Sequence, residues 1–400
     1  QVYTATYIKS RMTSPSIRAR GGADFAEQEH GEPETLTALE ALNESPRLAL
    51  LGGPGSGKSA VADFVALCMA GELLGSQDVN LKLLTSPPPG RKDTKDAPPK
   101  PQTWVHAALI PVQIILRDLA AQLPNPGVKT GAETIWNYLT ARLEQAALGA
   151  YAPHLHEELL SRGGLILLDG LDEVPEADTR REQIKQAVLD FVTSFSRCRF
   201  LVTSRIYAYQ KQAWQLDGFE TAELTPFGQE QIERFVGAWF DYMAQLARLT
   251  PDDARGRAAL LKQAITRNER LTSLAGQPLL LTMMARLQTE RGNRPLPERR
   301  EELYSQVVEM LLNQWEGLKT QLGADGKRVI EEPGLAEYLE TGREEIRRAL
   351  DKLAFEAHRD QLELKGTADI SQGRLMDALT QASKKESVKP KLLAKYVRDR

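Results

Sequence analysis

The chain has 400 residues, of which 42% are hydrophobic, and its 51 Lys and Arg against 54 Asp and Glu residues give a formal net charge of -3. This length and composition predict a soluble globular protein of about two to four compact units. The balanced charge excludes a strong overall field that would attract nucleic acid or anionic lipid. No apolar run approaches the about 20 residues of a membrane span, and the N-terminus lacks the layout of a signal peptide, so we expect no membrane partner.

The two cysteines, Cys68 and Cys198, lie far apart in apolar or strand-like sequence. Cysteines in such surroundings are typical of buried, reduced thiols, and they predict an intracellular, cytoplasmic protein. The chain begins at Gln1 rather than Met and stops at Arg400 within a predicted helix. We therefore expect the sequence to be a piece of a longer protein.

Residues 1–44 are polar and mixed, with glycines that break any long period. We expect them to form a linker, or approach segment, that ends in a short helix near Glu34–Leu42. An apolar run at Arg47–Leu51 then enters a glycine-rich turn, and helical periodicity follows at Ala60–Leu74. Proline and charged residues dominate 85–103, which predicts an exposed loop or insertion.

Strands and helices alternate through the rest of the first half. The predicted elements are a strand at Trp104–Leu116, a helix at Thr134–Leu148, a strand at Leu165–Leu168 that ends on Asp169, a helix at Arg180–Ser194 and a strand at Arg199–Thr203. This alternation favours crossover connections and a parallel sheet covered on both faces. The predicted fold class of this half is therefore α/β, with helices on both faces of a parallel sheet.

After Pro226 the strand signal fades, and apolar residues recur at helical spacing. Pro295 and Pro297 mark a break before a predicted helix at Glu298–Trp315. A looser connection at Gly317–Gly342 precedes another predicted helix at Arg343–Arg359. The second half is predicted to be mostly helical, without repeats at solenoid periods.

The strongest motif is the glycine-rich sequence that follows the strand at 47–51. It consists of Gly52, Gly53, Pro54, Gly55, Ser56, Gly57, Lys58 and Ser59, followed by Ala60 at the start of the helix. It fits the phosphate-loop pattern at every required position and has a strand before it and a helix after it. In such a loop the backbone N–H groups surround the phosphates, the lysine bridges the β- and γ-phosphates, and the hydroxyl ligates magnesium. We predict a nucleoside triphosphate site with Lys58 on the phosphates and Ser59 on Mg²⁺.

A phosphate loop also needs an acidic strand end, which Asp169 supplies as the predicted magnesium ligand. The residue that follows is Gly170, at a place where many ATPases have the glutamate that polarises the attacking water. That role must therefore shift to Asp172 or Glu173, and the sequence leaves both open. The alternative is that these two carboxylates form only a solvated acidic turn.

The predicted strand at Arg199–Thr203 ends in Ser204 and Arg205. An arginine at this strand end can read the γ-phosphate, because its charge is most useful where a triphosphate differs from a diphosphate. A surface arginine after a strand is the alternative.

Five stretches of the chain together resemble the NACHT group of signal-transduction ATPases with numerous domains, known as the STAND class. In chain order they are the phosphate loop, LILLDGLDEVP, FLVTSR, LTPFGQEQIERFVGAWF and LAGQPLLLTMM. The resemblance covers roughly residues 45 to 400, and the Asp-Gly-x-Asp-Glu element is its most specific part.

The resemblance implies a NACHT nucleotide-binding domain at 45–225, a small helical domain at 226–290 and a truncated winged-helix domain at 291–400. Together these would act as a switch that is closed with ADP and open and oligomeric with ATP. Pro278 would pack near the base, although a proline that merely starts a helix is the alternative. Partner domains outside this segment, an N-terminal effector and a C-terminal sensor, are implied as well, and relatives act in antiphage defence or innate immunity.

Three histidines receive no role. His358 lies in a different helical context from the winged-helix histidine that reads the diphosphate in relatives, and the matching segment would fall after Arg400. His154 and His156 bracket Leu155, a spacing that chelates a metal on a strand, but no cysteine or third histidine lies nearby in the sequence. We assign no zinc site.

The chain has no Asn-Lys-x-Asp element of the kind that guanine-specific GTPases use, so ATP and ADP with Mg²⁺ are the predicted ligands. The leading hypothesis is a slow ATPase that serves as a signalling switch. A cycling motor ATPase of the AAA type and a non-hydrolysing, nucleotide-gated scaffold are the alternatives. No sequence feature of this segment indicates direct nucleic-acid binding.

Overall fold

The computed structural model forms two compact units, Gln1–Pro295 and Leu296–Arg400. It describes residues 4–12, 36–91, 100–124, 128–174, 180–210, 214–292, 294–297, 299–316, 319–322, 328–332, 334–360, 370, 372–385, 388 and 393–394. Of residues 9–12, 314–316, 319–322, 328–332 and 372, only the backbone is described.

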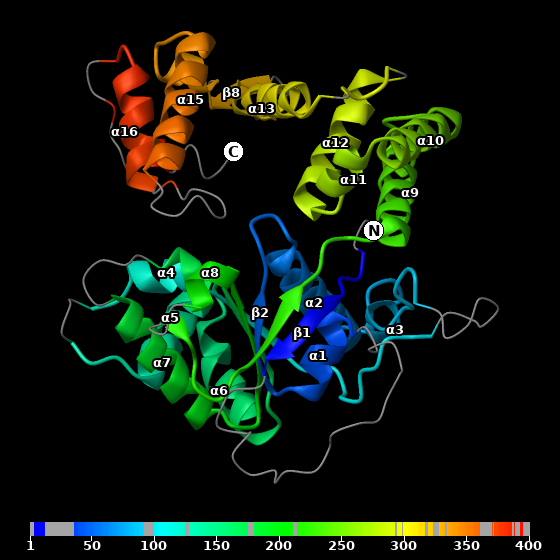
Figure 1. The fold of residues 1–400 in the computed structure, drawn as a ribbon. Coiled ribbons are helices and arrows are strands. Elements are labelled where there is room, and N and C mark those ends of the chain that lie inside the picture. Colours follow the sequence, from blue (N-terminus) through cyan, green and yellow to red (C-terminus); the bar gives the residue numbers. More distant parts are fainter. Residues whose placement is uncertain are drawn as a thin grey trace. The chain divides into compact units, whose positions relative to one another are not determined.

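A six-stranded sheet forms the centre of the first unit, with the strand order β1-β6-β2-β5-β4-β3 (Figure 1). Its strands are β1 (Ile8–Met12), β2 (Arg47–Leu51), β3 (Pro111–Ile115), β4 (Leu165–Asp169), β5 (Arg199–Ser204) and β6 (Glu220–Leu224). Five strands are parallel, and only β1, at the edge beside β6, runs antiparallel. Because β5 lies between β2 and β4, the strand that leads into the glycine-rich loop and the strand that ends on Asp169 are not neighbours.

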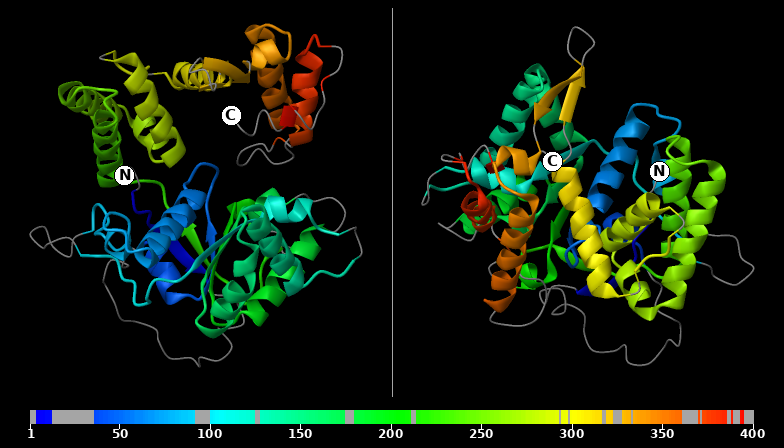
Figure 2. Two further views of the ribbon diagram at one scale, coloured as in Figure 1. Left: turned by 180° about the vertical axis from the view of Figure 1, so that it is seen from behind. Right: turned by 90° about the horizontal axis from the view of Figure 1, so that it is seen from above.

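Helices cover both faces of this sheet (Figure 2). The first face packs on α4 (Leu116–Ala121), α5 (Ala132–Gln145), α6 (Ala152–Ser161) and α7 (Arg180–Ser194), and the second on α1 (Ala38–Glu44), α2 (Lys58–Leu73) and α3 (Leu81–Leu84). Helices pack on both faces because successive side chains of β4 point to opposite sides of the sheet and are all apolar. Ile166 and Leu168 belong to the core on the first face, while Leu165 and Leu167 belong to the core on the second. All four are at most 1% exposed, as expected of a strand buried on both faces. The predicted α/β class is confirmed.

The first unit continues as four helices, α9 (Gln229–Gln245), α10 (Pro251–Arg267), α11 (Glu269–Ala275) and α12 (Pro278–Arg291). The starts of the last three have local causes. The side chain of Thr250 accepts a hydrogen bond from the N–H of Asp253 and caps α10, and Asn268 caps α11 in the same way. Pro278 occupies the first helical position of α12, where its missing N–H costs no helical hydrogen bond.

The second unit contains α13 (Arg300–Glu316), β7 (Lys319–Leu322), β8 (Arg328–Glu332), α14 (Leu335–Tyr338), α15 (Arg343–Arg359) and α16 (Gln372–Ala382). Its core includes Leu335, Leu339, Ile346 and Leu379, each 0% exposed.

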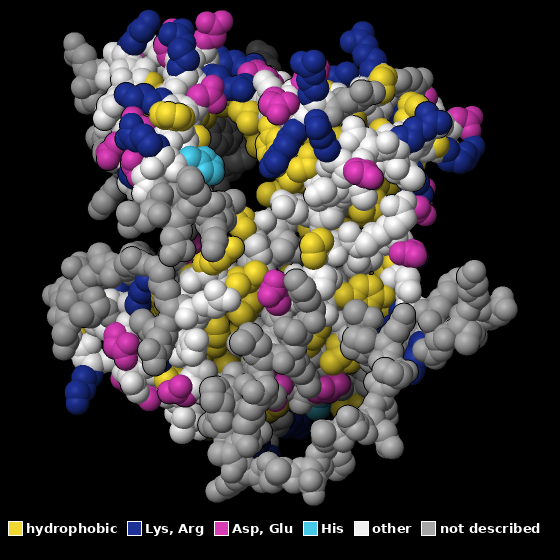
Figure 3. Space-filling model, in the orientation of Figure 1, with side chains coloured by type: hydrophobic (Ala, Val, Ile, Leu, Met, Phe, Trp, Pro, Cys, Tyr) yellow, Lys and Arg dark blue, Asp and Glu magenta, His cyan; other side chains and the backbone are white. Residues whose placement is uncertain are grey.

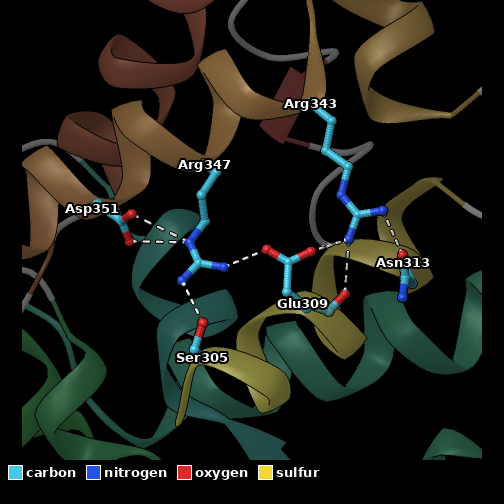
Figure 4. Close-up of polar contacts among 6 residues, drawn as sticks. All are labelled: Ser305, Glu309, Asn313, Arg343, Arg347 and Asp351. Atoms are coloured by element: carbon cyan, nitrogen blue, oxygen red, sulfur yellow. Dashed lines mark hydrogen bonds and ion pairs between the residues drawn. The ribbon is translucent and has the colours of Figure 1, made fainter. Parts of the chain in front are cut away.

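Glu309 of α13 joins two arginines of α15, with both ion pairs at 2.5 Å, to Arg343 and to Arg347 (Figure 4). Arg347 also pairs with Asp351, one turn further along α15. On the face of this unit that Figure 3 shows, basic and acidic side chains are interspersed. Because the ion pairs of Glu309 and Asp351 with these arginines are partly exposed, each contributes only about 0–1 kcal/mol to the stability of the unit.

Several predicted elements differ from the observed ones. Residues 1–44 are not merely a linker, because they contribute the edge strand β1, and the short helix begins later than expected, at Ala38. The sequence reading missed β1 and β6, whose alternating polar residues give a weak strand signal. The strand predicted at Trp104–Leu116 is limited to Pro111–Ile115, since α4 begins at Leu116.

The connection predicted at Gly317–Gly342 contains the β7–β8 hairpin and α14. Within the predicted insertion at 85–103, residues 92–99 lie outside the described residues.

Candidate functional site

The glycine-rich loop connects β2 to α2, and Lys58 is the first residue of that helix. Gly55 and Gly57 have φ angles of +69° and +93°, a region that L side chains rarely adopt. The Lys58 ammonium lies inside the loop, where Nζ donates to the carbonyl oxygens of Gly52 at 2.9 Å and Gly53 at 3.0 Å. Burial lowers the pKa of Lys58, while the charges of Asp172 and Asp169 act in the opposite direction. The loop therefore presents backbone N–H groups and a partly desolvated cation at the start of a helix, an arrangement that attracts anions.

The start of α12 contacts this loop directly. The N–H of Leu279 donates to the carbonyl oxygen of Gly55 at 3.1 Å. A Cβ on Gly55 would lie 2.7 Å from Cβ of Leu279, and one on Gly57 would lie 3.7 Å from Cγ of Pro278. The helix that begins at Pro278 is thus held against the loop, and at Gly55 this contact leaves no room for a Cβ.

Gly55→Ala is expected to lower the stability of the first unit by about 1–2 kcal/mol, since the residue would keep a left-handed conformation. It should also push Leu279 away from the loop. Gly53→Ala is the matched control, because its φ is not left-handed and a Cβ there would meet no described atom within 4 Å. Thermal unfolding of the two variants measures the difference, and equal melting temperatures would contradict the role of this contact.

Asp169 lies at the carboxyl end of β4, beside the loop. Its Oδ1 accepts hydrogen bonds from the Ser59 hydroxyl at 3.0 Å and from the Thr203 hydroxyl at 2.5 Å. Thr203 Oγ1 in turn accepts from the N–H of Gly170 at 2.8 Å, so β5 ties the acidic strand end into place. The hydroxyl and carboxylate that the sequence analysis paired as magnesium ligands therefore lie together, and they offer the hard oxygen donors that Mg²⁺ prefers.

The chain turns sharply after Asp169, because Gly170 has a φ of +79° and a single 3₁₀ turn follows at Leu171–Glu173. Leu171 is 0% exposed and fixes this turn in the core. Asp172 faces Arg205, since its Oδ1 accepts from the Arg205 N–H and its Oδ2 lies 3.0 Å from Arg205 Nε. The Asp172 side chain is 10% exposed, so its carboxylate is largely engaged with the strand end of β5.

Glu173 has different surroundings. Its side chain is 47% exposed, and Oε2 lies 3.3 Å from Nη1 of Arg117, at the start of α4. Burial of the inner part of the side chain raises the pKa of Glu173, and the negative charges of Asp172 and Asp169 raise it further, while Arg117 acts in the opposite direction. A carboxylate with a raised pKa and an accessible end is a better proton acceptor than Asp172.

These residues line one cavity of about 460 Å³. Its wall contains the loop residues from Pro54 to Ala60, Asp169, Gly170, Asp172, Glu173, Thr203, Arg205, Phe227, Phe235, Pro278, Leu279 and Thr282, together with Thr4 and Thr6. Pro278, which the resemblance placed near a base, is therefore part of the same cavity as Lys58 and Asp169. A volume of this size suits a small-molecule ligand.

Thr4 and Thr6 are the residues of this wall that the sequence analysis missed most clearly, because their segment was interpreted as a linker. They are 5% and 3% exposed. The segment lies against α9, where Gln231 Nε2 donates to the carbonyl oxygen of Ala5 at 2.6 Å, and Phe235 follows one turn later on the same helix. The run VYTATYI at 2–8, rich in β-branched and aromatic residues, is the signal that predicts an extended segment there.

The histidines and cysteines lie elsewhere. His154 and His156 are on helix α6 and not on a strand, and the His156 ring packs edge-on against Trp136 and Phe195. His358 is near the end of α15. Burial raises the pKa of Cys68 and of Cys198 to about 11. Both thiols therefore stay protonated near neutral pH and are poor nucleophiles.

A strand, a glycine-rich loop, a helix that begins at a lysine, and an acidic strand end on the far side of one intervening strand define the class of P-loop nucleoside triphosphatases. Residues 47–242 match the family model of the NACHT domain. These residues therefore form a NACHT domain, a family of nucleotide-binding NTPases of the STAND type. A search of curated proteins found no match. Among the described residues, no helix is both long and apolar enough to span a membrane.

Proposed function

We propose that this chain is the ATP-binding and slowly hydrolysing part of a signalling switch. The observation that carries the proposal is the hydrogen bond from the Leu279 N–H to the Gly55 carbonyl oxygen, which joins the helical part of the first unit to the phosphate loop. A ligand in the loop therefore meets both the sheet and α12. Because a nucleotide can shift a conformational equilibrium only by its differential affinity for the two states, a contact of this kind is where such a difference arises.

The phosphates are assigned to Lys58 and to the backbone N–H groups of Gly53 and of Gly55 to Ala60, since Pro54 has no N–H and the N–H of Gly52 donates to the Ser204 carbonyl oxygen. To accept them, Lys58 must exchange its two carbonyl partners in the loop for phosphate oxygens. Ser59 and Asp169 would hold Mg²⁺, which when bound neutralises charge on the phosphates. Arg205, placed by Asp172, reads the γ-phosphate.

Glu173 is the residue that we assign to polarising the attacking water. Asp172 accepts from both the N–H and Nε of Arg205, so its oxygens are engaged. Glu173 lines the cavity with an accessible carboxylate and a raised pKa. The missing glutamate at Gly170 is thus replaced by one three residues later, which the 3₁₀ turn brings back toward the strand end.

The base is assigned to the part of the cavity formed by Pro278, Phe227 and Phe235, with Thr4 and Thr6 beside them. Apolar walls with a few hydroxyl groups hold a planar base by packing. ATP and ADP remain the proposed ligands. The proposed domains are a nucleotide-binding domain at 45–225, a small helical domain at 226–290 and a winged-helix domain at 291–400.

In the proposed switch, ADP stabilises a closed state and ATP an open state that assembles with further copies of the chain. An N-terminal effector and a C-terminal sensor are the proposed partner domains, in a cytoplasmic defence or immune pathway. A shift of the states from about 1:99 to 99:1 requires about 5.5 kcal/mol of differential binding. Contacts of the γ-phosphate with Arg205 and of the loop with α12 contribute to that difference.

The steady-state rate of phosphate release tests the proposal. A switch is expected to turn over well below about 1 per second, whereas a cycling motor exceeds that rate and lies within the usual range of enzymes. ATP binding without any phosphate release would support the scaffold instead. A chain that binds neither ATP nor ADP would refute all three.

A further inference from the structure

Glu40 of α1 is a buried carboxylate outside the acidic turn, and the hydrolysis proposed above does not use it. Its side chain is 3% exposed. Oε1 accepts from Arg91 Nη1 at 2.5 Å and from the N–H of Thr103 at 3.2 Å, and Oε2 accepts from the N–H of Thr37 at 3.0 Å. Burial alone would raise the pKa of Glu40, but hydrogen bonds from Thr37, Arg91 and Thr103 lower it below its usual value. The carboxylate is therefore ionised and held from several sides.

The donors of Glu40 come from two different parts of the chain. Arg91 and Thr103 both belong to the proline- and charge-rich stretch 85–103, one before and one after residues 92–99, which are not described. Thr37 is the N-cap of α1 and forms a capping box with Glu40. One carboxylate thus joins two separate points of the proline-rich stretch to the first turn of α1. Loss of a charged partner at a site with this little exposure leaves the others unpaired, which is costly.

The start of α1 is in turn bound to the cavity wall. The N–H of Ala38 donates to the Thr6 carbonyl oxygen at 3.0 Å, and Tyr7 forms a bridge with Thr37. The Tyr7 hydroxyl donates to the Pro89 carbonyl oxygen at 2.7 Å, so the proline-rich stretch contacts this segment directly as well.

The segment of residues 4–7 contains a buried hydroxyl group that has no hydrogen-bond partner among the described residues. Thr4 Oγ1 is buried in the cavity wall and has no hydrogen-bond partner among the described residues. Buried hydroxyls are normally paired, so an unpaired one in a cavity wall points to a ligand that supplies the partner.

We propose that Glu40 is a positioning residue of the nucleotide site, which fixes residues 4–7 so that Thr4 and Thr6 contact the nucleoside. The proposal rests on the function proposed above and adds a route of control. Arg91 and Thr103 of the proline-rich stretch, through Glu40, set the position of this wall. The effect falls on the nucleoside and not on the phosphates, because the phosphate loop is held separately by β2 and α2.

Two variants test the role, Glu40→Gln and Arg91→Gln. The first keeps the shape of the Glu40 side chain, and the second removes its charged partner, whose side chain is 15% exposed, while Glu40 itself stays in place. Arg199→Gln is the matched control. Arg199 donates to the carbonyl oxygens of Leu42 at 2.7 Å and Asn43 at 3.0 Å, at the opposite end of α1. Each protein is measured for ATP affinity, for inorganic tripolyphosphate affinity, for kcat and KM of ATP hydrolysis, and for its melting temperature without ligand.

Both test variants are expected to weaken ATP affinity and raise KM by about threefold to tenfold, the effect of one or two lost hydrogen bonds. Tripolyphosphate affinity and kcat should stay within about twofold of the original chain, and so should the ATP affinity of the control. Unchanged ATP affinity in both test variants would overturn the inference, as would an equal loss for ATP and tripolyphosphate. If the original chain binds no ATP, the proposed function itself fails, and that outcome is distinct from the others.

Discussion

Glu173→Gln is expected to slow ATP hydrolysis by about 10²–10⁴-fold while the affinity for ATP stays nearly unchanged, because the variant removes a proton acceptor and keeps the shape of the side chain. The half-exposed Glu173 carboxylate lines the cavity and has a raised pKa, and neither feature is needed for holding phosphates. Single-turnover hydrolysis and equilibrium ATP binding measure the two effects separately. The effect on kcat should therefore far exceed the effect on affinity.

The pH profile provides a second reading of the same variant. The carboxylate must be ionised to accept a proton, so the rate should fall as the pH drops through the pKa of Glu173, which lies above that of an ordinary glutamate. Glu173→Gln should lack this acid limb. Asp172→Asn is the informative comparison, since it should weaken the hold on Arg205 and raise the KM for ATP. If ATP hydrolysis were unchanged in Glu173→Gln and lost in Asp172→Asn, Asp172 and not Glu173 would be the residue that polarises the attacking water.

Lys58→Met is expected to lower kcat/KM for ATP by about 10²–10³-fold, the effect of losing one preorganised donor at a site of developing charge. Burial already lowers the pKa of Lys58, so this cation is poorly hydrated and gains strongly from a phosphate partner. The same substitution removes the two hydrogen bonds to the loop carbonyl oxygens, and the ligand-free chain should melt at a lower temperature.

Lys82→Met supplies the control for this prediction. Lys82 is exposed on α3, so its loss changes the net charge by the same amount without touching the loop. ATP affinity measured by calorimetry should be unaffected in the control. Full ATP affinity in Lys58→Met would remove the basis for assigning the phosphates to this loop.

The sequence by itself determined the local parts of the site. The glycine-rich loop needs a left-handed backbone conformation at Gly55 and Gly57. Only glycine adopts this conformation without strain, so the residue types predict it. The apolar run before Asp169 likewise predicts a strand buried on both faces, which is observed as β4. The expected order of strand, glycine-rich loop and helix is observed as β2, the loop and α2. These features depend on neighbours along the chain, and for that reason they could be predicted.

Tertiary structure decided which distant groups meet. Asp172 and Glu173 are equivalent in the sequence, and only the approach of β5 and α4 gives one to Arg205 and the other to Arg117. Thr4 enters the cavity wall because β1 pairs with β6 and carries the preceding residues against α9. The contact of Leu279 with Gly55 joins residues more than 200 positions apart. Contacts of this kind arise from the packing of whole elements, about which short-range patterns of residues carry little information.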